Sequence, residues 1–253
     1  MISRRPPRVR VDQLLVERGL APSRAKAQAL VMAGAVSSGD RKIEKVGTPL
    51  DADAELRVAR AARFVSRGGD KLEHALSAFA ATGLDVAGSI AVDIGASTGG
   101  FTDCLLSRGA AKVYAVDVGY GQLAAKLRAD PRVVVRERTN ARDVTASDFD
   151  EPIDLVVVDA SFIGLSKLMP AIARILRAEG ALVALVKPQF EAGKEAANRG
   201  RGVIRDAAVR ERAIGEARNS VIEAGFVLHA GIDSALAGPK GNVEHFLYAT
   251  RRG

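Results

Sequence analysis

Residues 92–101 read VDIGASTGGF, and this stretch decides the fold of the larger part of the chain. Apolar residues lead into it from residue 90, and helical spacing of apolar residues follows it, so a buried strand passes through a glycine-rich turn into a helix. Glycines in such a turn allow a tight bend and let a ligand approach the backbone closely. The stretch therefore predicts a cofactor-binding turn in an α/β domain.

Three kinds of cofactor turn compete for this pattern. A phosphate-binding loop ends in Gly-Lys-Ser or Gly-Lys-Thr, whereas residues 99–102 read GGFT. A dinucleotide turn reads G-x-G-x-x-G, whereas the spacing here is G-x-x-x-G-G. An acidic residue at the strand end, Asp93, favours S-adenosylmethionine (SAM), which carries a charged amino group and a sulfonium where NAD carries a pyrophosphate. The predicted cofactor contacts are Asp93, Gly95, Ala96, Ser97, Thr98, Gly99, Gly100 and Phe101.

Strands and helices alternate around this turn. Strands are predicted at 89–94, 112–117, 132–136, 154–159, 181–187, 226–232 and 244–250, and helices at 69–81, 101–107, 122–127, 165–176 and 207–224. Strict alternation predicts a mostly parallel, seven-stranded, Rossmann-like sheet with helices on both faces. The last two strands follow each other without a full helix, which indicates an antiparallel pair at one edge.

Acidic residues stand at the ends of other strands. Asp117 lies 22 residues after Gly95, the position from which a carboxylate accepts hydrogen bonds from ribose hydroxyls in doubly wound folds. Asp143 follows the third strand and is expected to accept from the adenine amino group, and Asp159 ends the fourth strand. The glycine-rich turn and these carboxylates, in this order, predict a SAM-dependent methyltransferase.

The net positive charge of the chain comes from its N-terminal quarter. Residues 1–67 hold 14 Lys and Arg against 7 Asp and Glu, whereas residues 68–253 hold 23 of each. A basic segment beside a neutral one indicates a module that binds a polyanion, with a solvated basic face as the alternative. After a loose arm at residues 1–8, helical spacing from Arg10 and again after Ser23, then short β-like pieces, predict a compact module of about 50 residues.

Four polar residues are expected at the ligand-binding edge of the sheet. Lys71 opens the first helix of the larger domain, Asp159 and Lys187 end two strands, and Glu244 opens the last strand. Ligands of open α/β sheets bind outside the carboxyl ends of parallel strands. An antiparallel last strand would begin at that same edge. We therefore predict that these four side chains carry the chemistry.

The N-terminal module resembles the S4 RNA-binding domain over about residues 9–60. Among the residues that carry the resemblance are Arg10-Val-Asp12, Ser23-Arg24, Gly34-Ala-Val36 and Lys45-Val-Gly47. The resemblance implies RNA contacts at Arg10, Arg24, Lys26, Arg41, Lys42 and Lys45, and we predict a further RNA contact at Arg67 in the linker. The predicted organisation is an S4-like α+β domain at 1–59, a linker at 60–67 and a methyltransferase domain at 68–253.

The Lys-Asp-Lys-Glu order resembles the FtsJ-like 2′-O-methyltransferases. With the S4 module and the segments RGGDKL (67–72), VKPQFE (186–191) and GPKGNVEHF (238–246), the match narrows to the TlyA family, whose members are often labelled haemolysin. The resemblance implies methylation of the ribose 2′-hydroxyl of cytidine in RNA of one or both ribosomal subunits. It also implies an effect on susceptibility to peptide antibiotics such as capreomycin.

The tetrad would act on the ribose 2′-hydroxyl. This group is a poor nucleophile until it loses its proton or its oxygen is aligned with the methyl carbon. A lysine serves as the base only where burial or a second positive charge favours its neutral form. Lys71 near Lys187 would supply that charge, Asp159 would orient the pair, and Glu244 would hold Lys71 or the ribose hydroxyl. Alignment of the hydroxyl with the methyl carbon is the alternative source of rate. We predict Lys187 to be the most proton-active member.

Other functions receive less support from the sequence. A 2′-O-methyltransferase of another structured RNA, such as tRNA, would use the same tetrad, and a catalytically silent ribosome-assembly protein would not need one. A pore-forming haemolysin is disfavoured, because even the longest stretch without Asp, Glu, Lys or Arg, residues 27–39, is much shorter than the about 20 residues of a membrane span. We predict ribosomal RNA or ribosomal subunits as the partner, with no membrane and no protein partner.

Cysteine and histidine counts bear on compartment and metal. The single cysteine, Cys104, allows no disulfide framework within the chain and favours a reducing, cytoplasmic setting. Three histidines and one cysteine predict no zinc site.

Overall fold

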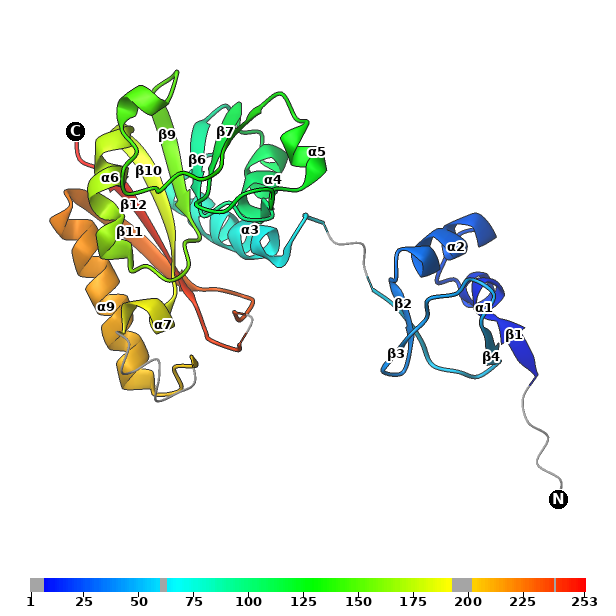
Figure 1. Cartoon of the computed structure of the whole chain (residues 1–253). Helices are drawn as coiled ribbons and strands as arrows, with labels where there is room; N and C mark the ends of the chain where they lie inside the picture. Colours follow the sequence, from blue (N-terminus) through cyan, green and yellow to red (C-terminus); the bar gives the residue numbers. More distant parts are fainter. Residues whose placement is uncertain (1–6, 60–62, 193–201, 239) are drawn as a thin grey trace. The chain divides into compact units, whose positions relative to one another are not determined.

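The computed structural model describes residues 7–59, 63–192, 202–238 and 240–253. The chain divides into two compact units, Met1–Ala62 and Arg63–Gly253. Figure 1 shows the elements of each unit. Residues 193–201, between the strand predicted at 181–187 and the helix predicted at 207–224, lie outside the described residues, as do residues 1–6 of the predicted N-terminal arm and residues 60–62 of the predicted linker.

The first unit is a small α+β fold, as the sequence predicts. Its elements are β1 (Arg8–Arg10), α1 (Val11–Glu17), α2 (Arg24–Met32), β2 (Val36–Ser38), β3 (Arg41–Lys42), β4 (Pro49–Asp51) and β5 (Leu56–Val58). Ser23 caps α2 by accepting a hydrogen bond from the backbone N–H of Lys26. The two helices and the strands enclose an apolar core of Val11, Leu15, Ala21, Ala27, Val31, Val36 and Ile43.

The sequence did not predict the strands β1 and β4 of this unit. The sequence indicated a loose arm at residues 1–8, but Arg8 belongs to β1, which pairs antiparallel with β4. The strands β2, β3 and β5 form a separate three-stranded sheet. A strand of three residues carries too little periodic signal to be recognised before its partner is known.

The second unit is built on a seven-stranded sheet. Its strands are β6 (Ile90–Ile94), β7 (Lys112–Val116), β8 (Val133–Arg136), β9 (Ile153–Val158), β10 (Leu176–Val186), β11 (Phe226–Asp233) and β12 (His245–Arg251). Their order is β11-β12-β10-β9-β6-β7-β8. The pairs from β10 to β8 are parallel, whereas β12 runs antiparallel to both β10 and β11. This confirms the Rossmann-like class and the antiparallel edge pair.

Helices cover both faces of this sheet. They are α3 (Arg67–Phe79), η1 (Ala80–Thr82), α4 (Gly100–Ser107), α5 (Ala125–Arg128), η2 (Ala146–Asp148), η3 (Leu165–Lys167), α6 (Met169–Ile175), α7 (Pro188–Glu191) and α9 (Ala207–Glu223). The long last helix is confirmed, and Asp206 caps it by accepting from the backbone N–H groups of Ala208 and Val209. The predicted helix at 165–176 is divided into η3 and α6, and α5 begins three residues later than predicted.

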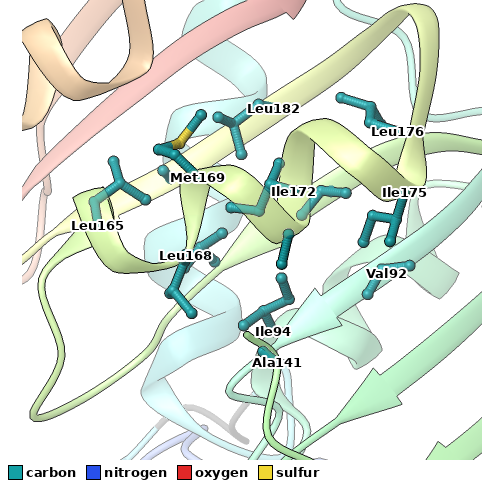
Figure 2. Packing of buried hydrophobic residues seen from close by; sticks show 14 of the residues in the cluster. Val92, Ile94, Ala141, Leu165, Leu168, Met169, Ile172, Ile175, Leu176 and Leu182 are labelled. Carbon is teal, nitrogen blue, oxygen red and sulfur yellow. The ribbon is translucent and has the colours of Figure 1, made fainter. Parts of the chain in front are cut away.

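Alternate residues of each strand enter opposite cores, because side chains point alternately to the two faces. In β6 and β9, Val92 and Val156 pack with α6 and α9, whereas Ala91 and Val157 pack with α3 and α4. Figure 2 shows the first core, where Leu168, Met169, Ile172 and Ile175 lie against the sheet. Burial on both faces explains why the strand at 153–158 has almost no polar alternation.

The predicted linker from Arg63 onward belongs to the second unit, and α3 already begins at Arg67. Phe64 is 4% exposed and packs in the core beside α3 and α4. Ser66 caps α3 by accepting from the N–H of Gly68. The start of this unit is therefore held by an apolar side chain and a helix cap.

Candidate active site

The glycine-rich turn joins the carboxyl end of β6 to α4. Gly95 and Gly99 have φ angles of +87° and +97°, a region that other residues enter only with strain. A Cβ on Gly95 would lie 2.8 Å from the carbonyl oxygen of Asp159, and one on Gly99 would collide with Leu127. Glycine is thus required both by backbone conformation and by the close approach of neighbouring segments.

Asp93 lies beneath this turn. Its side chain is fully buried, and its Oδ2 accepts hydrogen bonds from the backbone N–H of Thr102 at 2.9 Å and from the Thr102 hydroxyl at 2.7 Å. Burial, assisted by the nearby charge of Asp159, raises the pKa of Asp93 to about 7. Asp93 lines none of the three cavities of this region described below, so the structure places it as a support for the turn.

The larger cavity, of about 760 Å³, opens beside the carboxyl ends of β6, β7 and β9. Asp117 stands in its wall and accepts from the N–H groups of Ser97, at 2.7 Å, and Gly119, at 2.6 Å. Gly95, Ser97 and Asp159 also line it, so four of the predicted cofactor residues meet here. Its apolar lining includes Ile94, Val116, Ile163 and Leu168.

A smaller cavity of about 370 Å³ shares Gly95, Ser97 and Asp159 with the larger one. The predicted residues Ala96, Thr98, Gly100, Phe101 and Lys71 line it. Arg67, predicted as an RNA contact, also lines it and donates a hydrogen bond to the carbonyl of Ala237 at 3.1 Å. Asp159 therefore stands where the two cavities adjoin.

Besides Asp93, two predicted cofactor residues lie away from the two adjoining cavities. Asp143 lines a third cavity, of about 280 Å³, which shares Val116, Thr139 and Asn140 with the larger one. Gly99 lines none of the three and faces Leu123 and Leu127. Gly99 therefore serves the shape of the turn.

The residues present fit SAM. The Asp117 carboxylate can accept from ribose hydroxyls, the apolar wall suits a purine ring, and the Asp159 carboxylate suits a cationic ligand. A side chain at Gly95 would collide with the backbone of Asp159, next to both cavities. The sequence pattern and the shape of the site agree on this cofactor class.

The predicted tetrad forms two ion pairs. Lys71, from α3, donates a hydrogen bond of 2.6 Å from Nζ to Oε2 of Glu244, which directly precedes β12. Both side chains are almost fully buried, at 9% and 1% exposed. The antiparallel direction of β12 brings Glu244 to the same edge as the parallel strand ends.

The second pair joins Lys187, after β10, to Asp159, after β9. The Lys187 Nζ lies 2.7 Å from Asp159 Oδ1, and it donates hydrogen bonds to the Asp159 carbonyl at 3.2 Å and to the Ser161 hydroxyl at 2.9 Å. Lys187 itself lines neither of the two adjoining cavities, while Asp159 lines both. Ser161 was not predicted, although a hydroxyl two residues after a strand-end aspartate was a readable signal.

The loop after Asp159 contains further residues that the sequence did not single out. Phe162 is 91% exposed, has a φ angle of +65°, lines the larger cavity and lies with its ring centroid 5.1 Å from that of Phe190. Glu191 accepts from the N–H of Leu165 at 2.8 Å, and burial raises its pKa. Both contacts hold this loop against α7.

In the first unit, the six predicted RNA contacts are exposed: Arg10, Arg24, Lys26, Arg41, Lys42 and Lys45. Arg10 and Arg24 both bond to Asp12, which is buried. Among the residues that the structure describes, no helix is both long and apolar enough to cross a bilayer.

Comparison with protein families matches both units. The family of FtsJ-like methyltransferases matches residues 64–251, and the S4 domain matches residues 9–56. A protein of Mycobacterium tuberculosis named 16S/23S rRNA (cytidine-2′-O)-methyltransferase TlyA is 47% identical over 243 residues, which are 95% of this chain and 89% of that protein. Hemolysin A of Brachyspira hyodysenteriae is 41% identical over 95% of this chain and 99% of that protein.

Solved structures resemble the chain as well. A candidate hemolysin from Streptococcus thermophilus is 40% identical, with a TM-score of 0.73 over 97% of this chain and 89% of that one. A SAM-dependent methyltransferase from Mesorhizobium loti, 16% identical, has a TM-score of 0.51 over 69% of this chain and 96% of that one, a likeness of fold alone.

Proposed function

Because the chain belongs to the TlyA family of rRNA 2′-O-methyltransferases, with an S4 domain and an FtsJ-like domain, we propose that it methylates the ribose 2′-hydroxyl of cytidine in ribosomal RNA. The Mycobacterium tuberculosis relative, named for 16S and 23S rRNA, supports this substrate. We further propose a cytoplasmic location, which a ribosomal substrate supports.

The position of Asp159 is the observation that carries the proposal. Its side chain lines both adjoining cavities and forms the ion pair with Lys187. A residue at the junction of two cavities can hold the donor and acceptor of a transferred group within reach of each other, which supplies much of the rate of a bimolecular reaction. We assign this junction as the place of methyl transfer.

The residues that would hold SAM are Asp117, at the ribose hydroxyls, and the turn from Gly95 to Gly100. When bound, SAM supplies a methyl group that is electrophilic because it is attached to a sulfonium. Asp117 and Ser97 are already linked by a hydrogen bond, so the carboxylate and the turn are fixed relative to each other before binding.

The tetrad acts on the acceptor. Once the Lys187 ammonium has released a proton to solvent, its neutral Nζ receives the proton of the ribose hydroxyl, and the Asp159 carboxylate, 2.7 Å away, stabilises the ammonium that forms again. Lys71, fixed by Glu244, lines the smaller cavity and donates to an oxygen of the target nucleotide. Ser161 orients Lys187 through the hydrogen bond at its hydroxyl.

The test is a map of methylated riboses in ribosomal and transfer RNA. RNA would come from cells with the gene, without it, and with only a Lys187→Ala copy. We expect cytidine 2′-O-methylation in ribosomal RNA only with the wild-type gene. Loss of a tRNA site with unchanged ribosomal RNA would instead establish the alternative substrate, and unchanged methylation in both would reject the proposal.

A further inference from the structure

The first unit contains a buried carboxylate with three side-chain partners. Asp12, in α1, is 0% exposed. It accepts from Arg10 Nε at 2.9 Å and Nη2 at 3.2 Å, from Arg24 Nε at 2.8 Å, and from Gln28 Nε2 at 3.1 Å. The hydrogen bond from Arg10, followed by those from Arg24 and Gln28, holds the pKa of Asp12 well below its usual range despite burial. Asp12 is therefore ionised at neutral pH.

Its two arginine partners remain open to solvent. The side chains of Arg10 and Arg24 are 47% and 55% exposed. A guanidinium has five N–H donors, and Asp12 engages two on Arg10 and one on Arg24. Arg10 also lies over Gly47, where an added Cβ would be 3.5 Å from the guanidinium. Each arginine is thus fixed at Nε and still presents N–H groups outward.

The shared carboxylate holds two like charges together. Arg10 and Arg24 both bond to Oδ2 of Asp12, so their guanidinium groups converge on one atom although they come from β1 and α2. One buried negative charge beside two positive ones leaves the cluster cationic. Forked N–H donors of this kind match the oxygens of a phosphate.

We propose that Asp12 is a positioning residue for RNA binding, which fixes Arg10 and Arg24 as a preformed site for one backbone phosphate. This inference rests on the proposed function, because it takes ribosomal RNA as the ligand. Long side chains that are ordered before binding lose less entropy when they bind. The site should therefore bind RNA more tightly than its net charge alone would give.

The direction in which Asp12→Asn changes RNA affinity tells whether Asp12 acts by positioning the arginines or only through its charge. Asp12→Asn removes a negative charge from the RNA-binding unit, so electrostatics alone makes binding tighter and the dependence on salt steeper. Loss of positioning makes binding weaker. We expect full-length Asp12→Asn to bind a ribosomal RNA fragment about 5- to 20-fold more weakly than wild type, since two arginines must then be ordered on binding.

Glu17→Gln is the matched control, because Glu17 is exposed on the same helix and its substitution changes the charge equally. It should bind as tightly as wild type or tighter. In an Arg10→Ala/Arg24→Ala background, Asp12→Asn should no longer weaken binding. Weakening of the same size in that background would overturn the inference, as would Asp12→Asn binding as tightly as Glu17→Gln.

Arg24→Lys guards against misfolding of the Asp12 variant, since Arg24 is exposed. It keeps the charge but removes the Nε–H that Asp12 holds, so binding should weaken with an unchanged salt slope. Unchanged affinity of Arg24→Lys would count against the inference. If the wild-type protein itself failed to bind ribosomal RNA above tRNA, the proposed function would fail, a result distinct from all of these.

Discussion

The two ion pairs of the candidate active site differ in their access to ligand. Glu244 is 1% exposed and lines neither of the adjoining cavities, so its bond to Lys71 is a closed link between α3 and the start of β12. Asp159 is 23% exposed and lines both. We call Lys71–Glu244 the closed pair, because it mainly holds two elements of the site together. We call Lys187–Asp159 the open pair, because its carboxylate faces the reactants.

The largest effect should follow from changing Lys187. Lys187→Ala removes the proposed base, and general-base catalysis contributes about 10²- to 10⁴-fold. Single-turnover methyl transfer to ribosomal RNA should fall by this factor, with little change in SAM or RNA affinity.

Lys187→Arg sharpens that test, because arginine keeps the charge but does not lose its proton at accessible pH. A base role requires Arg to fail about as badly as Ala. Near-wild-type transfer by the Arg variant would mean that Lys187 acts as a fixed cation that aims the hydroxyl.

The closed pair should matter most for stability. Glu244→Ala leaves the Lys71 ammonium buried without its partner, which costs about 3–5 kcal/mol of unfolding free energy. Asp159→Ala should cost less, about 1–2 kcal/mol, because Lys187 keeps the Ser161 hydroxyl and a backbone carbonyl. All three tyrosines lie in the second unit and the chain has no tryptophan, so tyrosine fluorescence during urea unfolding reports on this unit. Equal losses in the two variants would contradict the comparison.

The raised pKa of Asp93 makes the stability of the fold depend on pH. Burial is the main cause of the rise, and the charge of Asp159, in the open pair, adds to it. The pKa of Asp93 is about 7 in the folded chain, against an ordinary value of 3.8. Between these two pH values, the folded chain keeps a proton that the unfolded chain has lost. Ionisation of Asp93 therefore destabilises the fold as pH rises from about 4 to 7. Relative to Asp93→Asn, the wild type should lose about 2–3 kcal/mol between pH 5 and 8. A difference independent of pH would reject the assignment.

The smallest effect concerns the larger cavity beside the open pair. Asp117→Ala should weaken SAM binding by about 1.5–3 kcal/mol, the range for a hydrogen bond to a charged group. Calorimetry with Glu223→Ala as the control, an exposed acidic residue at the end of α9, should show the loss only in the Asp117 variant. Unchanged affinity in folded Asp117→Ala would remove Asp117 from the cofactor site.

Much of the fold could be predicted because its signals are local. The turn at 95–100 needs glycines for its own backbone, and the strand at 153–158 is apolar throughout because it is buried on both faces. The short strands β1 and β4 were missed, since only their pairing makes them strands. Phe162 was missed because nothing local marks a loop residue as part of a cavity wall, whereas the Ser161 hydroxyl, two residues after a strand-end aspartate, was a signal that could have been read.

The sequence by itself determined the α/β class, the glycine-rich turn, the order of strand-end acids and the basic N-terminal module. Tertiary structure alone decided the partners: Lys71 bonds to a residue 173 positions away, Asp93 is buried under the turn, and Asp12 gathers two arginines. Periodicity and glycine conformation act over a few residues, whereas the pairing of charges depends on which strands become neighbours.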